Sequence, residues 1–260
     1  MGLALGWIGK RLARYLAGPM HVHGTGQPVD PERLLACLQP GDVLLVEGNS
    51  RVSTAIKYLT QSTWSHAALY VGSHLAEAGG RADHCCIDAD MVDGVRSFGI
   101  EEVADSHTRI CRPVGLTEAD RRRVTGFAIA RLGHQYDMRN VIDLARYFLP
   151  TPPVPLRFRR RLLALGSGDP TRAICSTLIA QAFQSIRYPI LPVIDSRNAG
   201  RPDCPGCVEE ILQLRHHSLF APRDFDVSPY FKIVKPTVST GFDFHDLRWE
   251  DSPLEQSAAQ

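Results

Sequence analysis

The sequence predicts an α+β fold in which an antiparallel sheet packs against helices. In the first half of the chain, short apolar segments bounded by Gly, Pro and Asp follow one another, a pattern typical of strands. Amphipathic segments of helical period come mostly later, and strands followed by helices favour this class over a doubly wound parallel sheet. The chain also has no internal repeat, no glycine-rich phosphate loop and no GxSxG motif.

Composition narrows the class of protein further. The 260 residues are 44% hydrophobic and 22% charged, which is ordinary for a soluble domain with a buried core. A formal net charge of +1 and the lack of a nucleic-acid-binding motif argue against nucleic acid as a partner. Seven scattered cysteines do not resemble a small secreted disulfide framework, and no apolar run reaches the roughly 20 residues that span a bilayer. We therefore expect a cytoplasmic protein.

Local signals place the first elements of the fold. Residues 30–41 predict a short helix that begins with Asp-Pro and ends at Pro-Gly. Residues 42–46, which are apolar after Asp42, predict a buried strand. Asn49 or Ser50 caps the helix that follows. The stretch STWSHAALYVG then contains a second buried strand, residues 66–71, with a histidine as its first residue.

The later elements follow from turn and capping signals. Asp93-Gly94 is typical of a hairpin turn, and Thr117 with Asp120 is typical of a helix N-terminus. Aromatic residues in the C-terminal tail are expected to cover the core. In chain order we predict a hairpin over 84–100, a strand over 108–115, helices over 117–133, 137–149 and 169–186, a strand over 230–236, and core contacts of Phe242, Phe244 and Trp249.

Two residue types distant in the sequence suggest a catalytic pair. Cys175 lies near the start of a predicted helix, where Asp169 or Thr171 is a suitable cap. The positive end of the helix dipole and a nearby imidazole would both lower the pKa of its thiol. His66, at the mouth of a strand, is the candidate imidazole. Such a thiolate attacks a carbonyl carbon while the imidazolium protonates the leaving group. The alternative is that both side chains simply pack in the core.

A carboxylate is expected to orient the imidazole and favour its charged form. The predicted strand after His66 offers Asp88 and Asp90 in the stretch CIDAD. Both side chains point the same way because side chains alternate along a strand with a period of two. The residues alone therefore leave the choice between the two open.

Four ordered motifs together resemble a known family, the permuted papain-like amidases of the YaeF/YiiX type. This family belongs to the wider NlpC and lecithin-retinol-acyltransferase-like superfamily. GDVLLVEGNSRVSTAIKYLTQSTWSHAALYVG resembles its opening, with Gly41-Asp42, Ser50 and Ser65-His66 in order. IDADMVDGVR resembles its acidic hairpin, GHQYDMRNVIDL its Gly-x-x-Tyr-Asp stretch, and ICSTLIAQAF its cysteine helix. The resemblance covers roughly residues 40–190.

The resemblance implies a circularly permuted papain-like (NlpC-like) fold, with the histidine first in the chain and the cysteine last. Cys175 would be the nucleophile and His66 the base and acid. The third residue of the family is typically a glutamate, and Asp88 stands at the matching position with one methylene fewer. Candidates for binding substrate or the oxyanion are the backbone N–H of Cys175 and three side chains: Tyr136, Ser176 and Ser65.

The implied activity is cysteine-dependent hydrolysis of an amide, in a cell-wall-type peptide or another small amide. The implied domain organisation is an N-terminal segment over 1–29, a catalytic domain over 30–235 and a tail over 236–260. No cofactor and no metal are expected. The CPGC stretch at 204–207 has zinc-like or redox spacing, but a structural zinc site requires further ligands that only the fold could supply.

Two basic segments raise the alternative of a substrate derived from lipid. Residues 1–18 have the pattern of an amphipathic helix, and residues 157–161 cluster four arginines. Together they are compatible with peripheral contact at the inner membrane surface, where the same pair would act as a lipid acyl hydrolase or acyltransferase. A helix docked on its own domain and a solvated loop are the simpler explanations. A third hypothesis is an inactive binding module.

Overall fold

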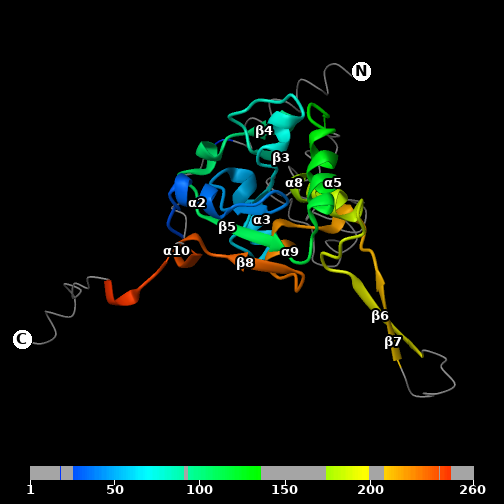
Figure 1. Ribbon diagram of the computed structural model, residues 1–260. Helices are drawn as coiled ribbons and strands as arrows, with labels where there is room; N and C mark the ends of the chain where they lie inside the picture. Colours follow the sequence, from blue (N-terminus) through cyan, green and yellow to red (C-terminus); the bar gives the residue numbers. More distant parts are fainter. Residues whose placement is uncertain are drawn as a thin grey trace, which may run out of the picture.

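A six-stranded antiparallel sheet forms the centre of the computed structural model, with the strand order β4-β3-β2-β1-β5-β8 (Figure 1). The structure describes residue 18 and residues 26–90, 93–135, 174–198, 208–239 and 241–246. The strands are β1 (Val43–Val46), β2 (His66–Tyr70), β3 (Cys86–Asp90), β4 (Gly94–Phe98), β5 (Thr108–Pro113) and β8 (Phe231–Val234). The predicted α+β class is confirmed.

Helices cover both faces of this sheet. Helices α5 (Glu118–Ile129) and α8 (Ile174–Gln184) lie on one face, where α8 contacts β2 and β3 and packs against α5 (Figure 1). Helix α2 (Pro31–Cys37) lies on the other face and inserts Leu34 beside Leu44. Because both faces are covered, all four residues of β1 are buried, which explains why this strand is uniformly apolar in the sequence.

Side-chain caps begin the helices at the predicted places. Asp30 accepts hydrogen bonds from the first amides of α2, and Ser50 accepts one from Ser53 N–H at the start of α3 (Arg51–Thr60). Ser50 is therefore the cap, and not Asn49. Thr117 and Asp120 form a reciprocal capping box at α5. Helix α5 ends at Ile129, four residues before the predicted Gly133, because turns occupy the residues between.

The Gly41-Asp42 pair has a structural explanation. Gly41 has φ +93°, a conformation that strongly favours glycine. Asp42 is completely buried, and it accepts hydrogen bonds from Gln39 N–H at 2.9 Å and from Arg112 Nη2 at 2.7 Å. The pair therefore ties the start of β1 to β5.

Some elements were not expected. Strands β6 (Val193–Asn198) and β7 (Val208–Gln213) form a separate two-stranded ribbon that projects from the body of the protein (Figure 1). Short helices complete the described part of the chain: α4 (His74–Glu77), η1 (Ile100–Val103), η2 (His217–Leu219), α9 (Pro222–Asp226), α10 (Pro236–Ser239) and η3 (Phe244–Asp246).

The prediction that the tail aromatics cover the core is wrong where it can be checked. Phe242 is 51% exposed and Phe244 is 61% exposed, because the chain beyond β8 leaves the sheet. Trp249 lies outside the described residues. So do the predicted helix over 137–149 and the basic segment 157–161. Among the described helices, none is both long and apolar enough to cross a membrane.

Candidate active site

His66 is the first residue of β2 and lies directly opposite Val46, the last residue of β1. Two hydrogen bonds hold the chain just before it. Ser65 N–H donates to the carbonyl of Val46 at 3.2 Å, and Ser65 Oγ accepts from Gly48 N–H at 2.9 Å. Ser65 is thus a buried residue that links β1 to β2. Its predicted role in substrate binding remains a prediction.

Asp88 on β3 contacts His66. Its Oδ2 lies 2.9 Å from His66 Nε2. The register pairs Leu69 with Ile87 and, if it continued, would place Asp88 opposite Ala68. Asp88 is then a diagonal neighbour of His66 on the same face of the sheet, a separation that the longer histidine side chain can span.

Asp90, the other carboxylate that the sequence offered, is placed differently. It is partly exposed at the end of β3, and its Oδ1 accepts a hydrogen bond from Asp93 N–H at 3.0 Å in the hairpin turn. Asp88 is buried and is the residue in contact with the imidazole. The structure therefore separates two residues that strand parity could not distinguish.

Arg96 is a member of this site that sequence reasoning missed. It lies directly opposite Asp88 in the β3–β4 hairpin, and its Nε and Nη2 contact the two carboxylate oxygens at 3.1 and 3.3 Å. Its Nη1 contacts Glu102 Oε2 at 2.9 Å. In the observed register Asp90 lies opposite Gly94, which pairs Asp88 with Arg96. A two-residue turn at the predicted Asp93-Gly94 would instead pair residue 91 with Arg96, so the predicted turn was no signal for this contact.

Cys175 is the second residue of α8 (Ile174–Gln184) and is 4% exposed. Its thiol hydrogen-bonds with the His66 imidazole and accepts a hydrogen bond from the backbone N–H of Ala67. Ser176 Oγ lies 3.9 Å from its sulfur. Since Nε2 of His66 faces Asp88, Nδ1 is the nitrogen that remains for the thiol.

The divergence of β2 and β3 explains how the thiol reaches β2. Tyr70 N–H donates to the backbone carbonyl of Asp42, on the β1 side of β2. Backbone amides alternate in direction along a strand, so the amide of Ala67 points to the other side, towards β3. Paired residues between β2 and β3 extend only over Leu69 and Tyr70. The Ala67 amide is consequently available to the sulfur of Cys175.

Charge perturbs all three titratable groups of the site. Burial alone would lower the pKa of His66, but the Cys175 thiolate and the hydrogen bonds of Asp88 and Cys175 hold that pKa well above its ordinary value. Burial alone would raise the pKa of Cys175, but the charge and hydrogen bond of His66 and the Ala67 amide lower it. The pKa of Asp88 is lowered against its burial by His66 and Arg96. These directions favour a thiolate, an imidazolium and a carboxylate side by side.

A second set of charged side chains lies around Glu47, at the end of β1 that faces His66. Glu47 directly follows β1 and is buried, with Lys57 Nζ at 3.3 Å and His107 Nδ1 at 3.2 Å from its two carboxylate oxygens. The His107 ring packs on Trp64, with ring centroids 4.9 Å apart. Sequence reasoning missed this group, although a glutamate at the end of an apolar strand was a signal for it.

Some of the predicted residues belong to segments that the structure does not describe. Tyr136 and the candidate caps Asp169 and Thr171 lie outside the described residues, as do residues 1–17 of the amphipathic segment. Ser176 is placed and is completely buried. Its predicted part in binding the oxyanion remains a prediction.

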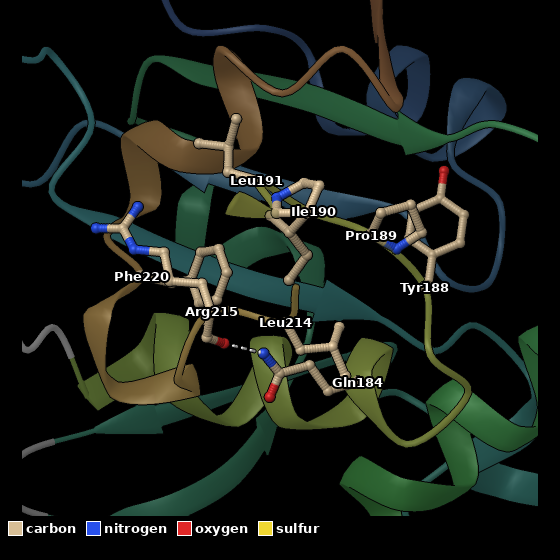
Figure 2. Close-up of a pocket in the computed structure, with 9 residues that line it drawn as sticks. Gln184, Tyr188, Pro189, Ile190, Leu191, Leu214, Arg215 and Phe220 are labelled. Atoms are coloured by element: carbon tan, nitrogen blue, oxygen red, sulfur yellow. Dashed lines mark hydrogen bonds between the residues drawn. The ribbon is translucent and has the colours of Figure 1, made fainter. Parts of the chain in front are cut away.

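A small pocket lies at the other end of α8. Figure 2 shows Gln184 of α8 facing Leu214 and Arg215, with Phe220 and the 188–192 segment around them. Gln184 Nε2 donates to the Arg215 carbonyl at 2.6 Å. Gln184 lies nine positions after Cys175 in the helix, a distance of about 14 Å along its axis. This pocket is therefore separate from the site around His66.

The fold and site together define a class. An antiparallel sheet with a histidine at a strand mouth, an acidic residue on the next strand and a later cysteine on a packed helix is a circularly permuted papain-like fold. Residues 37–148 match the model of the family described as permuted papain-like amidase enzyme, YaeF/YiiX, C92 family. The resemblance inferred from the motifs is confirmed, and the family is one of amidase-type hydrolases. The matched segment contains His66, Asp88 and Arg96 and ends before Cys175.

Comparison with solved structures gives a distant likeness. The structure titled metalloprotein yiiX from Escherichia coli O157:H7 is 16% identical, with a TM-score of 0.45, over 76% of this chain and 96% of that chain. This likeness is too distant to support a conclusion about the present chain. No curated protein matches the chain. Within the ranges that the structure describes, no three His, Cys, Asp or Glu side chains are grouped so that they could hold a metal ion.

Proposed function

We propose that the protein is a cysteine-dependent hydrolase of amide bonds, with Cys175 as nucleophile, His66 as acid and base, and Asp88 as the residue that orients the imidazole. One observation carries this proposal. The His66 ring lies between a buried thiol, to which it is hydrogen-bonded, and a carboxylate at 2.9 Å. The amidase family that matches residues 37–148 supports the reaction class.

The arrangement suits a two-step acyl transfer. The thiolate of Cys175 attacks the amide carbonyl, and the His66 imidazolium protonates the leaving amine, which gives a thioacyl enzyme. His66, now neutral, takes a proton from a water molecule that attacks the thioester and releases the acid. Asp88 keeps the ring oriented through Nε2 in both steps. The backbone N–H of Cys175 is a candidate donor to the oxyanion.

The alkylation of Cys175 by iodoacetamide tests the proposed pair. Because the pKa of Cys175 is lowered from 9.0, its thiolate persists as the pH falls below 9.0 and is lost only at the lower folded value. We expect fast labelling in that range for the wild type and a shift to higher pH for His66→Ala. The rate is read for each cysteine by peptide mass spectrometry between pH 5 and pH 10.

His74→Ala is the matched control, because His74 is another histidine of the same fold but bonds Thr125 on α5. It should leave the pH profile of Cys175 unchanged. An identical profile in wild type and His66→Ala would remove the pair and favour an inactive binding module.

The substrate class is tested by trapping the acyl enzyme. Small peptide amides of cell-wall type are expected to add an acyl mass to Cys175, and the Cys175→Ala variant should remain unmodified. Adducts that form with lipid esters and with no amide would contradict the amide part of the proposal.

A further inference from the structure

Two neighbouring cysteines at the start of β3 have no role in the proposed catalysis. The sulfurs of Cys85 and Cys86 lie 3.9 Å apart. Cys85 is half-buried, whereas Cys86 is completely buried between Tyr70 and Phe98, its partners on the adjacent strands. The pair therefore combines one thiol that solvent can reach with one that it cannot.

The backbone explains why the sulfurs of adjacent residues lie together. Consecutive side chains of a regular strand point to opposite faces. Cys85, however, precedes β3, and its backbone is held on both sides: its N–H donates to Phe98 at 3.0 Å, and its carbonyl accepts from Val71 N–H at 2.8 Å and Gly72 N–H at 3.1 Å. Its sulfur is held by a hydrogen bond from Ile100 N–H. These contacts keep the two thiols beside each other.

The two thiols also differ in acidity in the direction that an oxidation site requires. The hydrogen bond from Cys86, together with the Ile100 amide, lowers the pKa of the accessible Cys85 thiol. The same hydrogen bond and complete burial raise the pKa of Cys86 well above its ordinary value. Oxidants react with the thiolate form, so Cys85 is the first sulfur to be attacked and Cys86 remains a thiol beside it.

We propose that Cys85 and Cys86 form a peroxide-sensitive modification site, in which oxidation joins the two neighbouring residues by a disulfide. The Cys85 thiolate attacks one oxygen of hydrogen peroxide, the O–O bond breaks, and hydroxide leaves with a proton from solvent as water. The resulting sulfenic acid is then attacked by the Cys86 sulfur. The S–O bond breaks and a second water leaves, so that two thiols and one peroxide give one disulfide and two waters.

The structure also predicts that this bond is easily reversed. The Cα atoms of adjacent residues are about 3.8 Å apart, shorter than the roughly 4.4–6.8 Å usual across a disulfide. A strained disulfide is reduced more readily than a relaxed one, which is a property of regulatory bonds. Closing the ring must also displace Cys86, two residues before Asp88 on the same face of β3. Oxidation is therefore expected to loosen the contact between Asp88 and His66, a consequence that rests on the proposed function.

The experiment uses the full chain, reduced and then exposed to a few equivalents of hydrogen peroxide. Free thiols are blocked with N-ethylmaleimide before digestion with trypsin. Cleavage after Arg81 and Arg96 gives a peptide, residues 82–96, that contains Cys85 and Cys86 and no other cysteine. We expect this peptide to lose two hydrogens, to take no maleimide, and to regain two labelling sites after treatment with dithiothreitol.

Variants test the proposed order of steps. In Cys86→Ala, Cys85 loses the hydrogen bond from Cys86 but keeps that from the Ile100 amide. It should therefore react more slowly, stop at the sulfenic acid and be captured by dimedone. Cys85→Ser should leave Cys86 unoxidised at the same peroxide dose. Cys37→Ser removes another half-buried cysteine, which packs against the same group of buried apolar residues as Cys85, and it should not change the result. Circular dichroism establishes that each variant is folded, and the wild-type peptide decides the proposal even where a variant is not.

A peptide 82–96 that takes two maleimides after peroxide treatment would overturn the proposal. So would oxidation of Cys85 beyond the sulfenic acid while Cys86 remains a thiol. The labelling rate of Cys175, read from its own peptide in the same digest, should fall when the disulfide forms. Slow labelling of Cys175 already in the reduced protein would count against the proposed catalytic pair and would leave the disulfide result intact.

Discussion

Asp88 has one methylene fewer than the glutamate typical of the family that the motifs resemble, yet its oxygen reaches the imidazole at 2.9 Å. Arg96 explains how so short a side chain is held in place. Its guanidinium contacts both oxygens of Asp88, so the carboxylate is fixed from the β4 side while it faces His66 on the β2 side. Glu102 in turn holds Arg96. Negative and positive side chains therefore alternate from Glu102 through Arg96 and Asp88 to His66.

The first prediction concerns Arg96. Replacing it by Gln leaves the buried Asp88 with fewer partners, and since the Arg96 side chain is 33% exposed, solvent compensates for part of the loss. We expect Arg96→Gln to lower the free energy of unfolding by about 1–3 kcal/mol in a urea titration. Arg81→Gln is the control, because Arg81 pairs with Asp83 at an exposed site, and it should give no measurable change. Equal stability of all three proteins would mean that Arg96 does not hold Asp88.

At the scale of elements, α8 positions the thiol because its apolar residues are anchored in the core. Leu178, Ile179, Ala182 and Phe183 are all completely buried. The Phe183 ring makes an edge contact with Phe231 of β8, with centroids 5.3 Å apart. Anchored in this way, the helix that carries Cys175 is held against β2 and β3.

The second prediction tests this anchoring. Phe183→Ala removes a buried aromatic ring and should lower the free energy of unfolding by about 3–5 kcal/mol. Phe242→Ala removes a ring of the same size that is 51% exposed, and should change it by no more than about 0.5 kcal/mol. Urea titration followed by circular dichroism measures both. Similar losses in the two variants would contradict the assignment of α8 as the central core helix.

Local patterns predicted the elements of the sheet far better than the β6–β7 ribbon. Strands such as β1 are buried and therefore require an apolar sequence, which is a pattern that predicts a strand. Among the described residues no third strand pairs with the ribbon, and its apolar residues Val193, Ile194 and Leu212 are about half exposed. Without a buried face, no alternation of polar and apolar residues is required of it.

At the scale of the whole molecule, the site makes stability depend on pH. The folded pKa of Asp88 lies below its ordinary value of 3.8, so its ionised form stabilises the fold above that pH. This contribution is lost as the pH falls through the lower folded value. His66 has the opposite sign, because its pKa is raised from 6.5: its contribution is complete below pH 6.5 and is lost as the pH rises through the folded value.

The third prediction follows for Asp88→Asn. At pH 7 the variant leaves Arg96 and His66 without their carboxylate and should be less stable than the wild type by about 2–4 kcal/mol. The difference should shrink as the pH is lowered below 3.8, where the wild type loses the same charge. Urea titrations at several pH values measure it. Asp90→Asn, at the partly exposed carboxyl of the same strand, should give a smaller loss at pH 7. A difference for Asp88→Asn that does not change with pH would contradict the lowered pKa.

The sequence by itself determined the class of the fold, the helix starts at Asp30 and Thr117, and the candidate residues Cys175 and His66. These features depend on residues that are close together in the sequence, such as a cap within one helical turn or an apolar run along one strand. Only the tertiary structure decided that Asp88 rather than Asp90 contacts the imidazole, that Arg96 holds Asp88, and that the Ala67 amide reaches the thiol. Each of these depends on the register between strands and on where two strands diverge, and that geometry is set by packing across the whole sheet.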